Sequence, residues 1–361
     1  MNAPRSFHAG LSCLPGCLLL LAGCQSTPKS NLTDEQLRQR ALFCLKRGLE
    51  YEQNPVIRAQ AVEALQEVDP ESVAWIREAL RDPEPGVRFA ACMALGMLRD
   101  KNARQLLLTR VEDEDPNVRV AAVFALHRLK DYRYTSQLAD ALLTHHDPTV
   151  RANAAIALGR LGEKPSIRLL RRTKKDKDDR VHMQGLEARA RLGDEQAIKN
   201  LIIMTHGTAG APQAFAALAL GRAGVKRAAD ALRTRLEEGP HIETKLAAAR
   251  ALGMLGYPDG YELALKYLTW KKAGLTKPPE ESPEIQTMRV RSNAALALGA
   301  IGHPAALPHL HHLMENYPDP RVQLCAAKAI IEILNRTIRR PRSASPNPIA
   351  HGKPPAREAA P

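Results

Sequence analysis

The sequence predicts an all-α protein, built as a right-handed α-solenoid of about nine helical-hairpin repeats. An apolar position recurs at intervals of 30 to 32 residues, with one longer interval of 46. Small residues precede that position at fixed offsets, and the ends of the helices are recognisable in most repeats. A unit of about 31 residues cannot bury its own apolar face, so neighbouring units must stack to form a continuous core.

Each repeat is organised around one position, which we call the anchor. A small residue lies four positions before each anchor, and alanine lies one position before it. Offsets of −4, −1, 0 and +3, the last mostly aliphatic, share one face of an α-helix, and the alanines let a neighbouring helix approach closely. The nine anchors are Leu65, Leu95, Leu126, Leu158, Arg189, Leu220, Leu252, Leu298 and Ile330.

The ends of these inner helices are predicted from turn chemistry. Asp115-Pro116 and Asp147-Pro148 precede two of them, where aspartate caps free amides and proline fits the first helical position. Glycine follows the helix in five repeats, at the position that favours a left-handed backbone. These glycines are Gly162, Gly193, Gly224, Gly256 and Gly302.

The turn D-P-x-V-R followed by A-x-x-A-L-G-x-L-G resembles the HEAT repeat, in the short form also found in phycobilisome lyases. The resemblance extends from about Gln53 to Asn335 and is closest in repeats two to four. It weakens at Arg189, which replaces the anchor leucine, and at Pro212-Gln213 and Thr244-Lys245, which replace Val-Arg. Regular stacking at about 10 Å per layer predicts a curved rod on the order of 90 Å long.

The first residues read as an export signal. Residues 1–23 contain one cation, no acid and an apolar run, which is typical of a secretory signal and too short for a mature transmembrane helix. The run ends Leu21-Ala22-Gly23-Cys24, which resembles the lipobox of bacterial lipoproteins and implies lipidation of Cys24. Cys13 and Cys17 lack this pattern. An ordinary signal with a chance cysteine is the alternative.

The remaining chain divides into a spacer, the solenoid and a tail. Residues 24–32 form the lipidated cysteine and a polar spacer, and Thr33-Asp-Glu-Gln is a capping box that opens the solenoid of residues 33–335. Residues 270–286 form a Pro-rich insertion, and residues 336–361 a basic tail that composition predicts to be disordered. The tail carries a large share of the net charge of +13. This charge would suit contact with anionic lipid or envelope polymer, and the alternative is that it only keeps the protein soluble.

Candidate binding residues lie on the concave side of the solenoid. Offset +2 from the anchor gives Arg128, Arg160, Arg191 and Arg222 in four successive repeats. Offsets −6 and −2 give Phe89, Met93 and Phe124 beside them. Arginines pair with carboxylates and the apolar side chains supply anchors, so this groove would suit an acidic or amphipathic peptide. Alternatively, the apolar set packs against adjacent inner helices.

A second arginine series lies in the turns. These arginines resemble those of HEAT-like arrays, where a turn arginine in each repeat bonds to a turn aspartate and the series of bonds forms a ladder. The aspartates here are Asp82, Asp113 and Asp147, and we favour this structural role. The turn arginines are Arg58, Arg88, Arg119, Arg151 and Arg291.

Motifs for catalysis, metals and cofactors were not found in the sequence. No phosphate-binding loop, nucleophile elbow or dinucleotide motif is present, and we predict no cofactor. His309, His311 and His312 lack the converging ligands that a metal site needs, and the paired His-Glu motifs of iron-binding HEAT hydroxylases are missing. Cys44, Cys92 and Cys325 are expected to be free thiols.

These observations together predict a non-catalytic scaffold, exported and lipid-anchored at the bacterial cell envelope. The outer membrane is expected if the cell is Gram-negative, since aspartate does not follow Cys24. Its partner would be a protein or peptide in the solenoid groove, and export argues against nucleic acid. The alternative is a lyase or isomerase similar to the phycobilisome group.

Overall fold

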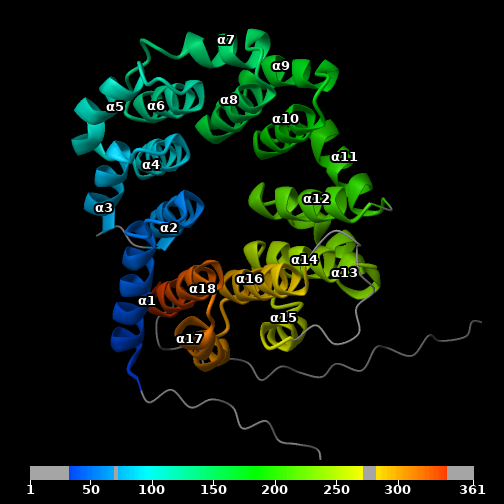
Figure 1. Cartoon of the computed structure of the whole chain (residues 1–361). Helices are drawn as coiled ribbons and strands as arrows, with labels where there is room; N and C mark the ends of the chain where they lie inside the picture. Colours follow the sequence, from blue (N-terminus) through cyan, green and yellow to red (C-terminus); the bar gives the residue numbers. More distant parts are fainter. Residues whose placement is uncertain (1–31, 69–71, 208, 271–281, 340–361) are drawn as a thin grey trace, which may run out of the picture.

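The computed structural model describes residues 32–68, 72–207, 209–270 and 282–339, and within these ranges the chain is helical without a β-strand. The helices alternate between two concentric layers (Figure 1). The inner layer consists of α2 (Pro55–Val68), α4 (Pro85–Leu98), α6 (Pro116–Arg128), α8 (Pro148–Leu161), α10 (Asp179–Arg191), α12 (Gly210–Arg222), α14 (Ile242–Met254), α16 (Pro283–Ile301) and α18 (Pro320–Arg339).

Apart from α1, the outer helices are shorter, and several of them begin or end as 3-10 helices. The α-helices are α1 (Asp34–Leu49), α3 (Val73–Glu78), α5 (Arg104–Arg110), α7 (Ser136–Thr144), α9 (Ser166–Leu170), α11 (Glu195–Thr205), α13 (Ala229–Glu238), α15 (Tyr261–Leu268) and α17 (Leu307–Asn316). The 3-10 segments are η2 (Ala79–Arg81), η3 (Lys101–Ala103), η4 (Arg171–Lys175), η5 (Lys226–Ala228) and η6 (Pro304–Ala306).

The predicted helix ends are confirmed. Thr33 and Gln36 form the capping box of α1, and the Asp115 carboxylate accepts from the amides of Asn117 and Val118 at 2.7 and 3.2 Å. All five predicted glycines have φ between 70 and 91°. In repeats two and three the same left-handed position is held by Arg99 and Lys130, with φ of 54 and 66°.

The anchors form the core between the layers. The eight aliphatic anchors are at most 5 % exposed. Arg189 is also buried, at 6 % exposure, because its Nε donates to the Asp194 carboxylate at 3.0 Å. A buried ion pair therefore replaces the apolar anchor in the fifth repeat.

The solenoid closes into a ring, which corrects the expected open rod. The last inner helix, α18, packs against α1 and α2 as well as α16 (Figure 1). Arg38 Nη1 donates to Asn335 Oδ1 at 2.7 Å across this closure. Interaxial distances shorten when small side chains lie between helices, and alanines and glycines fill the inner interfaces. The inner layer is therefore shorter than the outer one, and this curvature accumulates until the ends meet.

Two boundaries differ from the prediction. Residues 283–286, expected in the insertion, form the first turn of α16, because the Ser282 hydroxyl caps it by accepting from Ile285 N at 3.3 Å. Residues 336–339, expected in the tail, continue α18, where Arg336 bonds to the carbonyl of Ile301 at 3.1 Å. The signal, Cys24, most of the spacer and insertion and the rest of the tail lie outside the described residues. Among the described helices, none has the length and apolarity needed to cross a membrane.

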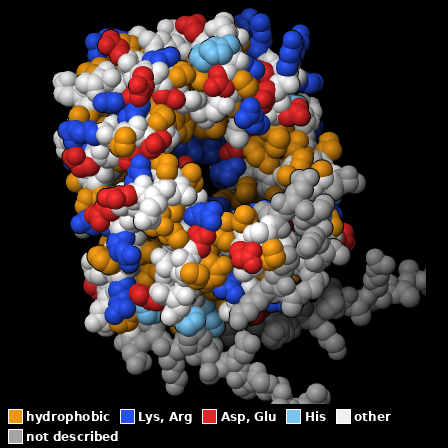
Figure 2. Space-filling model, viewed as in Figure 1, with side chains coloured by type: hydrophobic (Ala, Val, Ile, Leu, Met, Phe, Trp, Pro, Cys, Tyr) orange, Lys and Arg blue, Asp and Glu red, His pale blue; other side chains and the backbone are white. Residues whose placement is uncertain are grey.

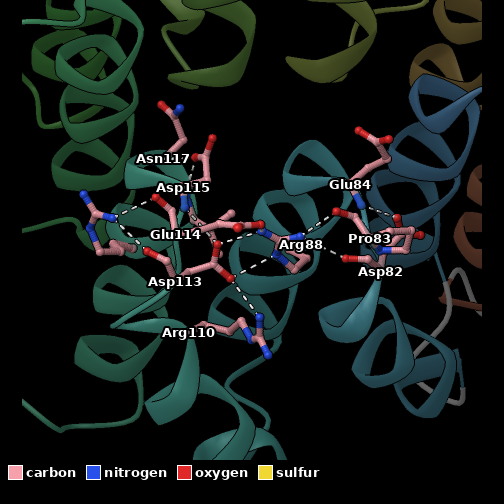
Figure 3. Close-up of polar contacts among 11 residues, drawn as sticks. Asp82, Pro83, Glu84, Arg88, Arg110, Asp113, Glu114, Asp115 and Asn117 are labelled. Carbon is pink, nitrogen blue, oxygen red and sulfur yellow. Dashed lines mark hydrogen bonds and ion pairs between the residues drawn. The ribbon is translucent and has the colours of Figure 1, made fainter.

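The turn arginines form the expected ladder. Arg88 donates to the carbonyls of Asp82 and Pro83 at 3.1 and 2.8 Å, at the end of the preceding outer segment (Figure 3). Its Nε and Nη2 meet both oxygens of Asp113, from the next turn, at 3.0 and 2.8 Å. Each such arginine thus ties three consecutive elements together. Arg58 pairs with Asp82 and Arg151 with Asp176 in the same way.

Three expected members of the ladder behave differently. Among the described residues, Arg119 donates to the carbonyls of Asp113 and Glu114 but to no aspartate side chain. Asp147 is not a ladder partner, because its carboxylate caps α8 by accepting from Thr149 N at 2.7 Å. Among the described residues, Arg291 hydrogen-bonds to the carbonyls of Trp270 and Thr269, at 3.0 and 3.3 Å, and its guanidinium lies over the ring of Tyr317. Replacements in other repeats keep the carbonyl contact, since Gln323 Nε2 donates to Tyr317 O at 2.6 Å.

Candidate functional site: the central cavity

The ring surrounds a cavity of about 730 Å³. Every inner helix except α6 contributes side chains to it, and Figure 2 shows the hollow with Lys and Arg side chains inside. Because the cavity runs through the middle of the ring, residues from distant repeats face one another across it. The groove expected on an open solenoid is therefore an enclosed lumen.

One side of the cavity is cationic. Arg160 on α8, Arg191 on α10 and Arg222 on α12 line it from three consecutive repeats, as predicted. The carboxylate of Glu187 on α10 lies among them and accepts two hydrogen bonds from Arg222, both at 2.8 Å. Arg191 Nη2 lies 3.5 Å from the same carboxylate.

The charge state of Glu187 follows from these contacts. Burial alone would raise the pKa of Glu187, but the hydrogen bond and charge of Arg222, together with Arg191, outweigh it and lower the pKa. Glu187 is therefore a carboxylate at neutral pH. It acts as an internal counter-ion for two of the three arginines.

Arg160 has no hydrogen-bonded counter-ion among the described residues, although the charge of Glu63 on α2 acts on it. Within the described ranges its guanidinium makes no hydrogen bond or ion pair, although the side chain is half-buried. Burial and the neighbouring charge of Arg191 lower the pKa of Arg160, yet an arginine remains protonated at neutral pH. Three arginines thus face two carboxylates, those of Glu187 and Glu63, and Arg250 and Lys328 add to the excess of positive charge in this partly desolvated place. An anionic group placed here would relieve that imbalance.

The cavity also has apolar lining residues. Phe89, Met93 and Met97 line it from α4, and Phe215 and Met254 add to it from α12 and α14. Methionine side chains adapt to differently shaped apolar partners. The cavity therefore combines cationic and apolar lining residues, and the predicted Phe89 and Met93 are among the apolar ones.

Two of the predicted binding residues are placed elsewhere. Phe124 is fully buried, and its ring packs against α4 so closely that a Cβ on Gly96 would lie 2.8 Å from Phe124 Cε1. Arg128 does not line the cavity, and its Nε reaches the Gly96 carbonyl at 3.4 Å. Both corrections have one cause: Gly96 leaves room for α6 to approach α4, which turns these side chains into the helix interface. For Phe124, the alternative prediction is confirmed, since its side chain packs against the adjacent inner helix.

Several lining residues were missed at the sequence level. Glu187, Arg250 and Lys328 all occur at offset −2 from their anchors, the position that gave Met93. Met97 and Met254 occur at offset +2, like the arginines. Extending the two offsets through all nine repeats, rather than through consecutive ones, would have identified them.

The cysteines and histidines show no constellation for chemistry. Cys44, Cys92 and Cys325 are free thiols, and burial raises the pKa of Cys44 to about 12. Cys325 lines the cavity, and burial raises its pKa as well. In the part of the chain that the structure describes, no three His, Cys, Asp or Glu side chains are grouped to hold a metal ion.

Two solved structures are similar to this chain over most of its length, at low sequence identity. The human deoxyhypusine hydroxylase in complex with glycerol is 20% identical over 83% of this chain and 98% of its own, with a TM-score of 0.36. The complex of CpcE and CpcF of phycocyanin lyase from Nostoc sp. is 19% identical over 79% of this chain and 100% of its own, with a TM-score of 0.41. No curated protein matches the sequence.

The repeats themselves match a family, described as HEAT repeats, over residues 44–127, 105–190, 135–209 and 286–345. These matches overlap along the first half of the ring and resume where α16 begins. They span more than half of the chain, and so the chain belongs to the HEAT-repeat family.

Proposed function

We propose that this protein is an exported, lipid-anchored and non-catalytic scaffold of the bacterial cell envelope that holds an acidic, extended segment of a protein or peptide partner in its central cavity. The observation that carries the proposal is the surplus positive charge of the cavity, where Arg160, Arg191 and Arg222 face the carboxylates of Glu187 and Glu63. Arginine is suited to carboxylates because its planar fork donates two parallel hydrogen bonds.

The closed ring defines the shape of the partner. A cavity of about 730 Å³ is in the range of sites for small ligands and cannot admit a folded domain. A chain terminus or an extended loop would thread in, with its carboxylates at Arg160 and its apolar side chains at Phe89 and Met93. Buried apolar anchors of this kind carry much of the energy of peptide binding.

Lipid anchoring rests on the resemblance of residues 21–24 to a lipobox. Two or more acyl chains make membrane attachment stable, at roughly 0.8 kcal/mol per buried CH₂. Cys24→Ala is expected to move the protein from the membrane to the soluble fraction, whereas Cys13→Ala and Cys17→Ala leave its partition unchanged. A Cys24→Ala protein that still fractionates with membranes would refute the anchor. The basic tail beyond α18 is proposed to meet anionic lipid or envelope polymer.

A lyase or isomerase that acts on a small anion is the second candidate. The volume of the cavity favours it, since a substrate of that size would be enclosed. The lowered pKa of Glu187 weighs against it, because a proton-transferring carboxyl usually has its pKa shifted toward neutrality. Release of a modified product from an incubated anionic ligand would distinguish this candidate from simple binding.

The binding proposal is tested with a matched pair of variants. The probe is a fluorescein-labelled hexapeptide that alternates glutamate and phenylalanine, and the measurement is its fluorescence anisotropy. Arg160→Gln should weaken binding at least tenfold, about 1.4 kcal/mol, with the melting temperature nearly unchanged. Arg128→Gln removes the same charge outside the cavity and should bind normally.

Two further measurements complete the test. Affinity for the probe should fall as salt is raised, because the arginine charges are screened. Deleting residues 340–361 should affect binding less than Arg160→Gln. Equal binding by Arg160→Gln and Arg128→Gln, with a loss in the tail deletion, would refute the cavity as the binding site.

A further inference from the structure

Among the first four turn arginines, Arg58, Arg88, Arg119 and Arg151, one belongs to an incomplete rung of the ladder. In each complete rung, an aspartate in the turn before an inner helix accepts the amide of the residue two positions later and pairs with the arginine of the previous repeat. Asp82 accepts from Glu84 N at 2.9 Å, Asp113 from Asp115 N at 3.1 Å and Asp176 from Asp178 N at 3.0 Å.

His145 takes the place of aspartate in the turn before α8, between the rungs of Asp113 and Asp176. Its Nδ1 accepts from Asp147 N at 3.1 Å, which is the bond that the aspartates make elsewhere. With Nδ1 as the acceptor, the neutral ring carries its proton on Nε2. The second ring nitrogen is then a donor, so it cannot accept a hydrogen bond from an arginine as an aspartate oxygen does. The turn keeps its geometry, but the carboxylate is missing.

Arg119 is the arginine left without that carboxylate. Its Nη1 still donates to the carbonyls of Asp113 and Glu114, at 2.7 and 3.2 Å. In Arg58, Arg88 and Arg151, Nε and Nη2 meet the aspartate. In Arg119, these two nitrogens make no hydrogen bond to any residue that the structure describes. The guanidinium of Arg119 is thus held in position by Nη1, while Nε and Nη2 keep N–H groups that these residues do not use.

A cavity of about 220 Å³ lies at this gap, between α6, α7 and α8. Arg119 and His145 line its polar side, and Val120, Val123 and Leu138 line its apolar side. The exposed Asp140 lines the cavity as well, and its negative charge disfavours a ligand that carries more than one negative charge. The site therefore combines an anion-binding fork, an aliphatic wall and room for one small group.

We propose that this cavity binds the carboxylate of a glutamate side chain from a partner protein, which completes the rung that His145 leaves open. The carboxylate accepts from Arg119 Nε and Nη2, as Asp113 accepts from Arg88, and the glutamate methylenes lie against Val120 and Val123. Asp140 selects a monocarboxylate over a phosphate group. The site is independent of the central cavity, and a partner could occupy either one alone.

The test uses two probes that differ in one group. N-acetyl-glutamate N-methylamide and its glutamine analogue are each mixed with the full-length protein at about pH 7.5, where the carboxylate of the glutamate probe is ionised. Saturation transferred from protein to the probe methylenes is then measured by NMR. The glutamate probe should receive at least fivefold more saturation than the glutamine probe, because only its carboxylate pairs with Arg119.

The decisive variant is His145→Asp, which supplies the missing carboxylate from within. It should abolish saturation of the glutamate probe and raise the melting temperature by about 2 °C, because it restores a rung. Arg119→Gln should also abolish the signal, whereas Arg99→Gln, an exposed arginine in the neighbouring repeat, should keep it.

Equal saturation of the two probes, or an undiminished signal in His145→Asp, would overturn the proposal and leave a cavity filled by water only. Arg160→Gln, which tests the central cavity, should leave this signal unchanged. The two sites can therefore fail separately.

Discussion

At the scale of single residues, the buried pair of Arg88 and Asp113 shows what the turn ladder contributes. Their side chains are 6 % and 1 % exposed, and Arg110 also bonds to Asp113 at 2.8 Å. Removing one partner of a buried pair leaves an unpaired charge and typically costs about 3 kcal/mol. Asp113→Ala should lower the free energy of unfolding by that amount in urea denaturation. Glu78→Ala, which breaks the exposed pair with Arg81, should change it by less than about 0.5 kcal/mol.

The ladder also sets the response of the protein to acid. Burial alone would raise the pKa of Asp113, but hydrogen bonds from Arg88, Asp115 N and Arg110 lower it, and the pKa of Asp82 is lowered likewise. Hydrogen bonds from Arg133 lower the pKa of Asp131 to about 2. The folded state therefore binds fewer protons than the unfolded state, in which aspartate has a pKa of about 3.9.

The direction of the pH effect follows from these lowered values. The stabilisation by these aspartates is complete above the unfolded pKa of about 3.9 and is lost as the pH falls from there toward about 2. Urea midpoints should be nearly constant from about pH 7 to 5 and fall steeply below about pH 4. Asp113→Asn should show a shallower fall. A midpoint that rises on acidification would contradict the ladder.

Residue-level prediction succeeded where the pattern is local. The anchors, the caps and the cavity-lining residues Met93 and Arg160 all follow from fixed offsets on a helix. Phe124 has the same offset as Met93 but does not line the cavity, because the helix that carries it packs closely against its neighbour at Gly96. A single sequence pattern does not contain that local rotation and distance.

At the scale of the elements, the spacing between inner helices depends on glycines at their contacts. A Cβ on Gly96 would lie 2.7 Å from Ala125 Cα, which is backbone and cannot move aside without shifting α6. Gly96→Ala should therefore destabilise the protein by about 1–3 kcal/mol, in spite of the better helix propensity of alanine. Gly86, in the first turn of the same helix α4, has nothing within 4 Å of its Cβ position.

Gly86→Ala is the matched control. It should be neutral or stabilising by up to about 1 kcal/mol, because it only reduces the freedom of the unfolded chain. Both variants are compared by thermal and urea unfolding. Similar effects of the two substitutions would show that the contact between α4 and α6 is looser than the structure indicates.

Element boundaries were predictable to the extent that side chains cap the backbone. Asp115 with Pro116 and Thr33 with Gln36 mark helix starts that the structure confirms. Ser282 has the same capping role for α16, but the proline-rich run before it suggested a longer insertion. The start of that helix depends on its packing in the ring, and local composition did not reveal it.

At the scale of the whole molecule, the number of repeats was predictable but the closure was not. The offsets define how each inner helix contacts the next one, and the nine repeats follow from their period. Closure depends on small differences in interhelical distance that add up over all repeats. The contact of α18 with α1 and α2 joins the first and last repeats, for which no periodic signal exists.

Closure predicts an inverted order of two distances. Phe43 on α1 and Thr337 on α18 are exposed and lie on helices that pack together, whereas exposed Ile203 lies on α11, across the ring (Figure 1). Pairs of spin labels are introduced at 43 and 337, and at 43 and 203, with the other cysteines replaced. Packed helices are about 10 Å apart, so with the label arms the first pair should be separated by roughly 20–30 Å, and the second by more. In an open rod of about 90 Å the order is reversed, because residues 43 and 337 lie at opposite ends. A longer distance for the first pair, measured by electron spin resonance, would show that the solenoid is open and that the central cavity does not form in solution.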